Sequence, residues 1–528
     1  MNYTFCCDEP FMNSPAFTAF MLYRDEIAPV LERKRSALDR MYAPVMGRPE
    51  IDPVFLMGLT LLQIMERLPD RQAVAACRFD VRWRTALNIP GDWRGINSST
   101  LVYFRKRLIQ HGQSKLALDA ALEAMRNAGY LKARASVRID STHLLGDIAR
   151  MSRLECVRES LRLALEFLVQ LDDSADWEPW YGRYTDRNPQ ELRNPTEDRL
   201  RTTMVQAGTD CREILTLAET LGKTVWESNP IQLLRRVFEE QFEATPTITS
   251  RRAVVPGGIQ NPHDPEAMWS TKRSIGKTGW VGYKVQVCET VTDEKRRKGE
   301  PTETVITAVV TQPAITSDHG SLMPVLHEHE QMGNAPAETT YTDAGYISAT
   351  QLVRAESEGL EICGPMPAPP HGKDRFGTDA FDVNLPERKA VCPGGKTSSA
   401  CSCIRESNHA GPYYYFEWSL ADCSGCPLKA QCLSAKKLQP FRTIQVSEHH
   451  MAAQERRRLC RTQDYRERMK KRNAIEGTIS ELKRRYGIRR ARYRGLQKTT
   501  LQIIFSASAC NLRRWATRRN WMEKRQNA

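Results

Sequence analysis

Three acidic residues occupy positions from which a carboxylate could bind a metal ion. Asp140 ends the β-branched run "RASVRID", Asp343 ends "ETTYTD", and Glu476 precedes the basic stretch "LKRRYGIRRARYR". The first two runs predict short strands that end in an acid. Acids at the carboxyl ends of neighbouring strands can meet in one crevice, and a helix packed across that end can add a third. Such a trio suits two Mg²⁺ or Mn²⁺ ions, which would activate the attacking oxygen and stabilise the leaving oxygen in phosphodiester cleavage.

The alternative is that each acid is a turn or cap residue, as an isolated Asp at a strand end usually is. Against it, an unpaired carboxylate beside a buried strand is costly without a cation or hydrogen bonds. Asp318, which precedes an amphipathic run, is interpreted as a helix cap, and only a distant fourth acid.

Two cations share a helical face with Glu476. Arg472 precedes it by four residues and Lys483 follows it by seven, so all three fall on one side of a helix. A structural i,i+4 ion pair between Arg472 and Glu476 would produce the same spacing. In the functional interpretation Glu476 binds metal, while Arg472 and Lys483 bind DNA phosphates.

Basic residues dominate positions 483–494. They are Lys483, Arg484, Arg485, Arg489, Arg490, Arg492 and Arg494. A run of one sign repels itself unless a polyanion offsets it, which favours DNA contact over a merely solvated surface. Phosphate contacts would supply affinity that falls with salt, and the interleaved Tyr486 and Tyr493 could stack on unpaired bases.

A cysteine-rich segment lies between residues 367 and 440, where Gly, Pro and Ser are also frequent. Its "CSGC" motif has the C-x2-C spacing that can fill two corners of a zinc tetrahedron. The four-ligand prediction for a structural zinc site is Cys392, Cys423, Cys426 and Cys432. Competing ligands are Cys401, Cys403 and His409. A metal-free, reduced cluster is the other interpretation, and the scattered remaining cysteines argue against a secreted disulfide framework.

Size and charge narrow the class of protein. The 528 residues allow several domains, and the formal charge of +14 favours a polyanionic partner. The longest apolar run, "VFLMGLTLLQIM", is shorter than the roughly 18 residues that a membrane span needs. The amino terminus "MNYTFCCDEP" lacks the basic and apolar regions of a secretory signal. We therefore expect a cytoplasmic, nucleoid-associated protein that binds DNA rather than membrane.

The order of patterns predicts four regions. Residues 1–130 show helical periodicity, typical of a small DNA-binding and oligomerisation domain or of a plain helical bundle. Residues 131–366 alternate strands and helices, with a helical insertion at about 145–261 and an antiparallel strand pair in "GWVGYKVQVCETV" and "ETVITAVVTQP". The cysteine-rich insertion spans 367–440. Residues 441–528 complete the core and end in an amphipathic, basic helix.

Several motifs together resemble the DDE transposases of bacterial insertion sequences. They are "RIDST", "YTDAGY", the R-x3-E-x6-K spacing of Arg472, Glu476 and Lys483, "INSSTLVYFRKRL", "CSGCPLKAQC" and "RARYRGLQKTTLQIIFSASACNLRRW". The resemblance covers nearly the whole chain apart from roughly residues 145–261. One departure is Met469, where related elements have a tyrosine three residues before the arginine. Tyr465, one turn earlier, is the only nearby substitute.

The resemblance implies an α/β fold with an RNase H-like mixed sheet and flanking helices, after an all-helical amino-terminal domain. It implies Asp140, Asp343 and Glu476 as a Mg²⁺-binding triad. Such enzymes bind the terminal inverted repeats of double-stranded element DNA, cleave the ends and join them to target DNA, commonly as homodimers. The alternatives are a nuclease of the same fold and an inactivated, non-catalytic DNA-binding relative.

Overall fold

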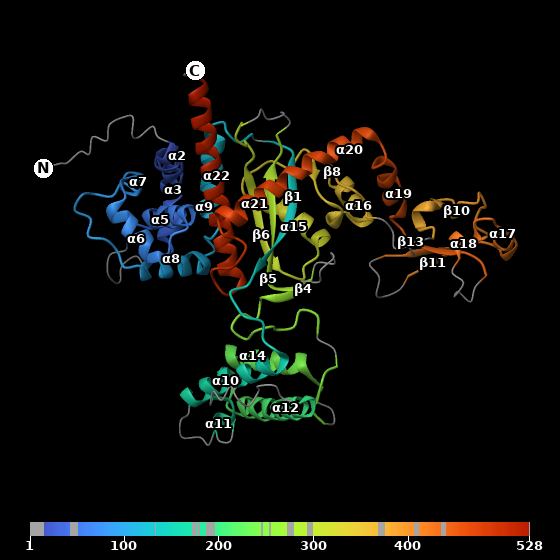
Figure 1. Cartoon of the computed structure of the whole chain (residues 1–528), viewed down its shortest axis with the longest axis horizontal. Coiled ribbons are helices and arrows are strands. Elements are labelled where there is room, and N and C mark those ends of the chain that lie inside the picture. Colours follow the sequence, from blue (N-terminus) through green and yellow to red (C-terminus); the bar gives the residue numbers. More distant parts are fainter. Residues whose placement is uncertain are drawn as a thin grey trace.

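A central mixed sheet organises the molecule. The computed structural model describes residues 15–42, 51–132, 134–171, 177, 180–185, 196–243, 247–252, 255–271, 279–292, 299–367, 375–405, 411–433 and 440–526. Amino-terminal helices lie on one side of the central sheet, a small β unit lies on the opposite side, and a helical unit projects from one end (Figure 1).

The amino-terminal region is entirely helical, as predicted. Its elements are α2 (Pro15–Leu22), η1 (Tyr23–Ile27), α3 (Ala28–Arg33), α4 (Arg35–Asp39), α5 (Pro53–Glu66), α6 (Asp70–Phe79), α7 (Val81–Ala86), α8 (Ser99–Gln110) and α9 (Leu116–Asn127). Asp52 caps α5 by accepting a hydrogen bond from the Val54 N–H at 3.0 Å. Nearly every residue of α5 is buried, so it forms the centre of this region.

The central sheet consists of β1 (Val137–Leu145), β4 (Met268–Thr271), β5 (Gly279–Thr290), β6 (Ile306–Pro313), β7 (Thr340–Tyr341) and β8 (Ile362–Cys363). β5 pairs with β1 on one side and with β4 and β6 on the other. β1 is antiparallel to β5 and parallel to β7, which is parallel to β8. The predicted antiparallel pair of β5 and β6 is confirmed. The prediction that the first strand ends at Asp140 is wrong, because β1 stays paired with β5 as far as Leu145.

Helices cover both faces of the sheet. Val137, Ile139 and Cys288 pack with α15 (Asp318–Gln331), η2 (Ala344–Tyr346) and α16 (Ala349–Ser357). Tyr283, Val285 and Val287 face the other way, into the core shared with the amino-terminal helices and with α22 (Leu496–Gln526). Alternate residues of each strand therefore serve different cores.

The sequence predicts an amphipathic, basic helix at the carboxyl end, and the structure places a single long helix there, much of it buried. All residues of α22 from Leu501 to Leu512 are buried, since the helix runs between the amino-terminal helices and β6. Asn511 fixes this contact, accepting from the Ile306 N–H and donating to the Ile306 carbonyl, both at 2.8 Å. Most of the exposed basic residues of α22 lie in its last turns.

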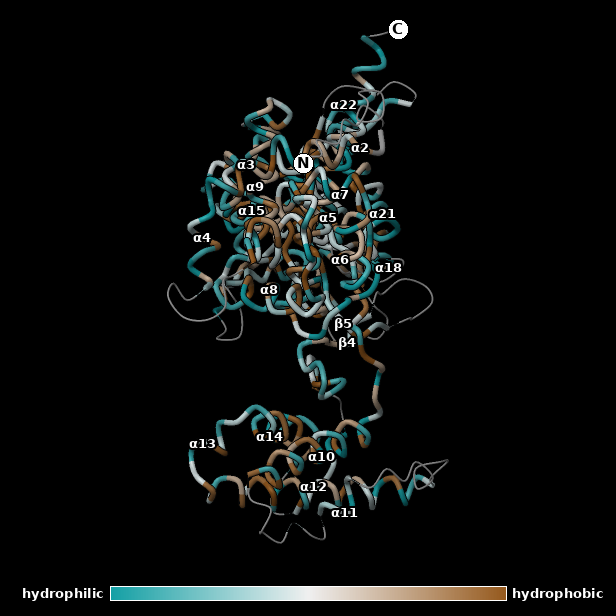
Figure 2. The backbone as a smooth tube through the Cα atoms, turned by 90° about the vertical axis from the view of Figure 1, so that its left-hand side faces the viewer, coloured by the Kyte–Doolittle hydropathy of each residue, from teal (hydrophilic) through white to brown (hydrophobic). Residues whose placement is uncertain are grey.

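Two insertions have cores of their own. The helical one contains α10 (Arg153–Leu171), α11 (Trp180–Thr185), α12 (Glu197–Thr220), α13 (Lys223–Trp226), α14 (Asn229–Gln241), β2 (Phe242–Glu243) and β3 (Thr249–Ser250). Figure 2 shows it separated from the rest of the molecule, with apolar segments turned inward.

Within the described residues, no helix has the length and apolar character needed to cross a membrane.

The cysteine-rich insertion folds as a small β unit around Phe381, Phe416 and Trp418. It contains η3 (Thr378–Ala380), β9 (Asp382–Asn384), β10 (Lys389–Val391), β11 (Ala400–Ile404), β12 (Tyr413–Glu417), α17 (Leu420–Ser424) and α18 (Lys429–Cys432). β13 (Thr443–Ser447) pairs with β12, so the β unit extends past the predicted boundary at residue 440. The chain then returns to the central sheet through α19 (His450–Leu459), α20 (Gln463–Met469), η4 (Lys470–Ala474) and α21 (Ile475–Arg485).

His329 makes the attachment of α15 to the sheet sensitive to pH. Its buried ring pairs with the Thr307 hydroxyl at 2.7 Å through Nδ1 and with the Ala335 carbonyl at 3.2 Å through Nε2. Burial disfavours the imidazolium and lowers the pKa of His329 to about 4. The neutral ring therefore stabilises the fold above pH ~6.5, its pKa in an unfolded chain, and this stability is lost as the pH falls towards 4.

We expect His329→Gln to flatten the acid side of the stability profile. Glutamine has a donor and an acceptor but does not titrate, so up to about 3 kcal/mol of pH-dependent stability between pH ~6.5 and ~4 should disappear. Urea unfolding across this range measures the effect. The exposed His319→Gln is the matched control, and an equal acid slope in wild type and His329→Gln would contradict the assignment.

Candidate active site

Asp140 and Asp343 lie where two parallel strands diverge. β1 and β7 pair only through Val137 with Thr340 and Arg138 with Tyr341. Each acid lies two residues beyond the last residue of its strand that pairs β1 with β7. After β7 the chain continues into η2, whereas β1 continues along β5. The carboxyl ends of neighbouring parallel strands are where α/β sheets usually bind ligands.

The Asp140 carboxylate is half-enclosed and close to a second negative charge. Its Oδ1 accepts from the Ser141 N–H at 2.7 Å, and its Oδ2 accepts from Arg472 Nη2 at 3.2 Å. Burial raises the pKa of Asp140, and the Asp343 carboxylate raises it further, while the Ser141 N–H and the Arg472 guanidinium oppose the rise. The two acids are thus close enough to repel each other, and a cation between them would relieve that repulsion.

A third carboxylate, Asp318, lies beside Asp343. A Cβ atom added at Gly345 would lie 3.1 Å from Asp343 Oδ1 and 3.4 Å from Asp318 Oδ2. Asp318 does not cap α15, since Ser317 does so by accepting from the Gly320 N–H. Instead it accepts from Lys284 Nζ at 3.2 Å and Gln286 Nε2 at 3.3 Å. The interpretation of Asp318 as a cap is therefore wrong, and no local sequence signal indicated its proximity to Asp343.

The fully buried Tyr346 joins these acids. Its hydroxyl donates to the side-chain oxygen of Gln286. Burial raises the pKa of Tyr346, and the negative charges of Asp318, Asp140 and Asp343 raise it further. The negative charges of all three aspartates thus act on the Tyr346 phenol.

Glu476 approaches the same face of the sheet from a helix. It lies in the first turn of α21, which packs against β1, and its exposed side chain forms no hydrogen bond or ion pair with another described residue. Arg472, four residues earlier, lies in η4 and reaches Asp140 instead of Glu476. The structural i,i+4 ion pair considered from the sequence is thus absent, and this side of the segment is turned towards Asp140.

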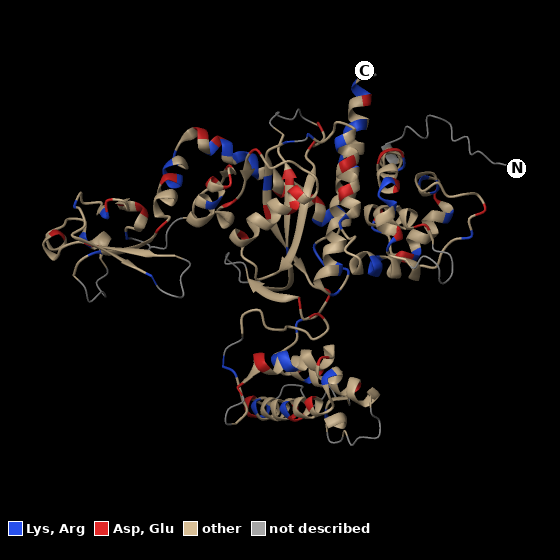
Figure 3. Ribbon diagram, turned by 180° about the vertical axis from the view of Figure 1, so that it is seen from behind, with Lys and Arg blue, Asp and Glu red and all other residues tan. Residues whose placement is uncertain are grey.

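The basic stretch is exposed and hydrogen-bonded to the end of β1. Its exposed members are Arg484, Arg485, Arg489, Arg490, Arg492 and Arg494, and Lys483 is half-buried. The Leu145 N–H donates to the Arg489 carbonyl at 3.0 Å, and the Ala491 N–H donates to the Leu145 carbonyl at 2.7 Å. None of the six exposed arginines pairs with a carboxylate in the described part of the chain. Figure 3 shows basic residues continuing along α19–α21 beside the sheet.

The tyrosines of this region have structural roles. Tyr486 is buried and its hydroxyl donates to the Ala509 carbonyl at 3.3 Å, so it cannot stack on a DNA base without leaving the core. The half-buried ring of Tyr493 lies 5.6 Å from the Arg105 guanidinium. Tyr465 is also buried, and it donates to the Gly364 carbonyl at 3.2 Å and accepts from Arg456 Nη1 at 2.7 Å. The ring of Tyr465 is therefore not free to take the place of the tyrosine that related elements have at position 469.

Four cysteines of the β unit line a single cavity. They are Cys392, Cys423, Cys426 and Cys432. A Cβ atom added at Gly394 would lie 3.5 Å from Cys426 Sγ and 3.7 Å from Cys392 Sγ. Burial raises the pKa of the Cys432 thiol, and the other three thiols raise it further, while the Arg442 guanidinium opposes the rise. All described cysteines are reduced.

The competing cysteines point elsewhere. Cys401 and Cys403 lie on β11, outside this cavity, and His409 lies outside the described residues. No group of three or more His, Cys, Asp or Glu side chains in the described ranges is spaced to hold a metal ion. The structure thus brings together the predicted thiols, and Asp140 with Asp343, without closing either set into a coordination shell.

Comparisons with known families match two parts of the chain. Residues 22–107 match a transposase domain (DUF772), and residues 391–516 match a transposase DDE domain. The matches support a DDE insertion-sequence transposase. The DDE match contains Glu476, Lys483 and the cysteine cavity, whereas Asp140 and Asp343 lie outside both matched ranges. No curated protein and no solved structure matches the chain.

We expect Tyr465→Phe to destabilise the protein because it leaves the buried N–H and carbonyl of Gly364 without their hydroxyl partner. Unsatisfied buried polar groups cost about 1–3 kcal/mol, and the variant should lose that much free energy of unfolding. Chemical denaturation measures it. Tyr103→Phe, at an exposed tyrosine, is the matched control, and equal stability of the two variants would contradict a structural role for the Tyr465 hydroxyl.

Proposed function

We propose that the protein is a Mg²⁺-dependent transposase that binds the terminal inverted repeats of an insertion sequence, cleaves the DNA ends and joins them to target DNA. The observation that carries the proposal is that the Asp140 and Asp343 carboxylates lie close to each other, just beyond the residues that pair β1 with β7. Arg472 donates a hydrogen bond to Asp140. The transposase DDE match, which includes Glu476, supports the same chemistry.

The fold proposal is an RNase H-like core. Its support is a sheet in which the first strand lies between an antiparallel neighbour and a parallel one, with helices on both faces and the acids just beyond the residues that pair β1 with β7. We place the first part of this core at 131–366, the cysteine-rich insertion at 367–440 and the last part at 441–528. The helices of 1–130 would bind DNA or mediate dimerisation.

Asp140, Asp343 and Glu476 would hold the divalent ions. When bound, Mg²⁺ or Mn²⁺ supplies Lewis-acid activation of the attacking oxygen and neutralises charge on the leaving oxygen. Arg472 neutralises Asp140 and is positioned to move to a DNA phosphate, and Lys483 lies on the same helix as Glu476. The exposed arginines of residues 484–494 would bind the backbone of double-stranded DNA independently of sequence. A homodimer would hold the two element ends together.

The test is cleavage and joining of the element's ends by purified variants. We expect Asp140→Asn, Asp343→Asn and Glu476→Gln each to lose at least about 100-fold in cleavage, because even the partners of metal ligands contribute 10- to 100-fold. DNA binding, measured by anisotropy, should stay within about twofold. The exposed Glu455→Gln is the matched control.

The alternatives have distinct outcomes in the same assay. Supplying pre-cut ends with a free 3′-hydroxyl separates joining from cleavage, and a nuclease would cut but never join. A non-catalytic DNA-binding relative would bind the ends tightly but leave them intact in Mg²⁺ and Mn²⁺. Full activity in any one of the three acid variants would remove that acid from the proposed triad.

We also propose that Cys392, Cys423, Cys426 and Cys432 bind a structural Zn²⁺. The support is their common cavity around Gly394, with Cys401 and Cys403 excluded from it. Small movements of four thiols that already line one cavity would suffice for tetrahedral coordination, which needs Zn–S distances of about 2.3 Å. Bound zinc would stabilise a β unit whose apolar core is small.

We expect about one zinc per chain by elemental analysis, and Co²⁺ exchange should give the visible absorption of a tetrahedral thiolate site. Cys432→Ser should lose the metal and lower the thermal stability, whereas the exposed Cys403→Ser should retain it. Zinc-free protein whose melting temperature does not respond to chelators or to added Zn²⁺ would contradict the site.

A further inference from the structure

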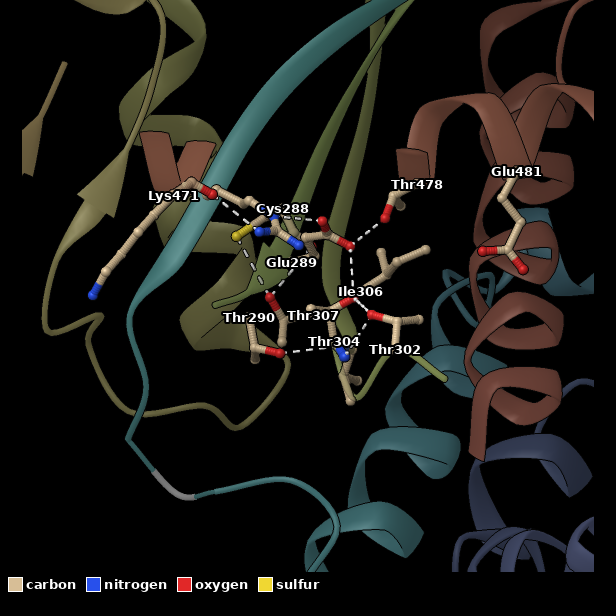
Figure 4. Close-up of polar contacts among 12 residues, drawn as sticks. Cys288, Glu289, Thr290, Thr302, Thr304, Ile306, Thr307, Lys471, Thr478 and Glu481 are labelled. Carbon is tan, nitrogen blue, oxygen red and sulfur yellow. Dashed lines mark hydrogen bonds and ion pairs between the residues drawn. The ribbon is translucent and has the colours of Figure 1, made fainter. Parts of the chain in front are cut away.

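A fully buried carboxylate lies between two arginines next to the candidate site. Glu289, near the end of β5, accepts from Arg138 Nε at 2.6 Å and from Arg514 Nη1 at 3.1 Å. All three side chains are buried, and Figure 4 shows the Glu289 carboxylate directed towards Thr478, among a group of threonines. Because desolvating three charges is expensive, an apolar cluster would serve stability equally well, and the network calls for another explanation.

One side of the network holds α21. The Thr478 hydroxyl donates to Glu289 Oε2 and accepts from Arg514 Nη2, both at 2.6 Å. Glu481, one turn later, accepts from Arg514 Nε at 3.1 Å and Nη2 at 3.0 Å. These contacts fix both the height and the rotation of the helix that carries Glu476.

The other side of the network holds β1 and η4. Arg138 is the cross-strand partner of Glu289 and precedes Asp140 by two residues, so both project from the same face of β1. Arg138 Nη1 also donates to the Lys471 carbonyl at 3.0 Å, next to Arg472. Arg138 thus ties the segment that supplies the Asp140 partner to the strand that carries Asp140.

At the start of α21, Ile475 is buried, but the side of the helix that faces the network borders a polar cavity. A polar cavity of about 370 Å³ borders Ala474, Gly477 and Thr478, and Arg138 and Arg514 form part of its wall. Leu482, in the later part of the helix, belongs to the main apolar core. The turn that carries Glu476 is therefore held on this side by hydrogen bonds.

We propose that Glu289, together with Arg138, Arg514 and Thr478, is a positioning residue that sets Glu476 and Arg472 against Asp140. The inference rests on the proposed function, since it assigns Glu476 to the metal site. It predicts that weakening the network lowers the affinity for divalent ions without altering any candidate ligand. A purely structural network would affect folding stability alone.

The experiment titrates the full-length protein with Mn²⁺ alone, following free Mn²⁺ by electron paramagnetic resonance. Thr478→Val removes the bridging hydroxyl with little change in shape, and we expect the half-saturating Mn²⁺ concentration to rise about tenfold. Thr478→Ser, which keeps the hydroxyl, should stay within about twofold of wild type. Thr60→Val is the matched control, because the Thr60 hydroxyl is equally buried and donates only to the Leu56 carbonyl in its own helix.

Two further variants separate the possible failures. If Glu476→Gln weakens Mn²⁺ binding while Thr478→Val binds like wild type, the positioning role is wrong and the proposed function stands. If Glu476→Gln binds Mn²⁺ like wild type, Glu476 is not a ligand and both proposals fail. If Thr478→Val does not fold, Glu481→Gln replaces it, because this change weakens the contact between the partly exposed Glu481 and the buried Arg514. An unchanged Mn²⁺ affinity of Glu481→Gln would overturn the inference.

Discussion

The buried charge of Glu289 is the interaction on which the arrangement of this site depends. A carboxylate without solvent must be matched by cations and hydrogen bonds, and here the partners come from β1, α21 and α22. β1 is distant in sequence from α21 and α22, so satisfying one side chain fixes their relative positions. The same elements carry Asp140, Glu476 and the core contact of Asn511 with β6.

A second constraint is electrostatic repulsion at the end of the sheet. The charges of three aspartates, Asp140, Asp318 and Asp343, act on Tyr346. Asp140 accepts from Arg472, Asp318 from Lys284 and Asp343 from the Gly345 N–H. These contacts satisfy each carboxylate only in part. In the proposed function, a divalent cation and the phosphates of bound DNA would complete the charge balance, which would explain why acids and arginines lie close together at this site.

Much of the chemistry could be read from residue patterns, because it depends on local spacing. The β-branched runs before Asp140 and Asp343 indicated strands, and the C-x2-C pair indicated a clustered set of thiols. The contacts between side chains from distant segments could not be predicted in this way. The pairing of Arg472 with Asp140 and the proximity of Asp318 to Asp343 depend on segments far apart along the chain, which no local pattern records.

The sequence by itself determined the acids, the basic stretch, the cysteines and the helical or extended character of most segments, since these follow from residue type and periodicity over short distances. Only the tertiary structure decided which residues meet. It extended β1 past Asp140 by pairing it with β5, buried α22 among other helices, and enclosed Tyr465 and Tyr486 in the core. The physical reason is that strand pairing and burial are set by contacts between distant segments, whose cost and gain appear only when the whole chain packs.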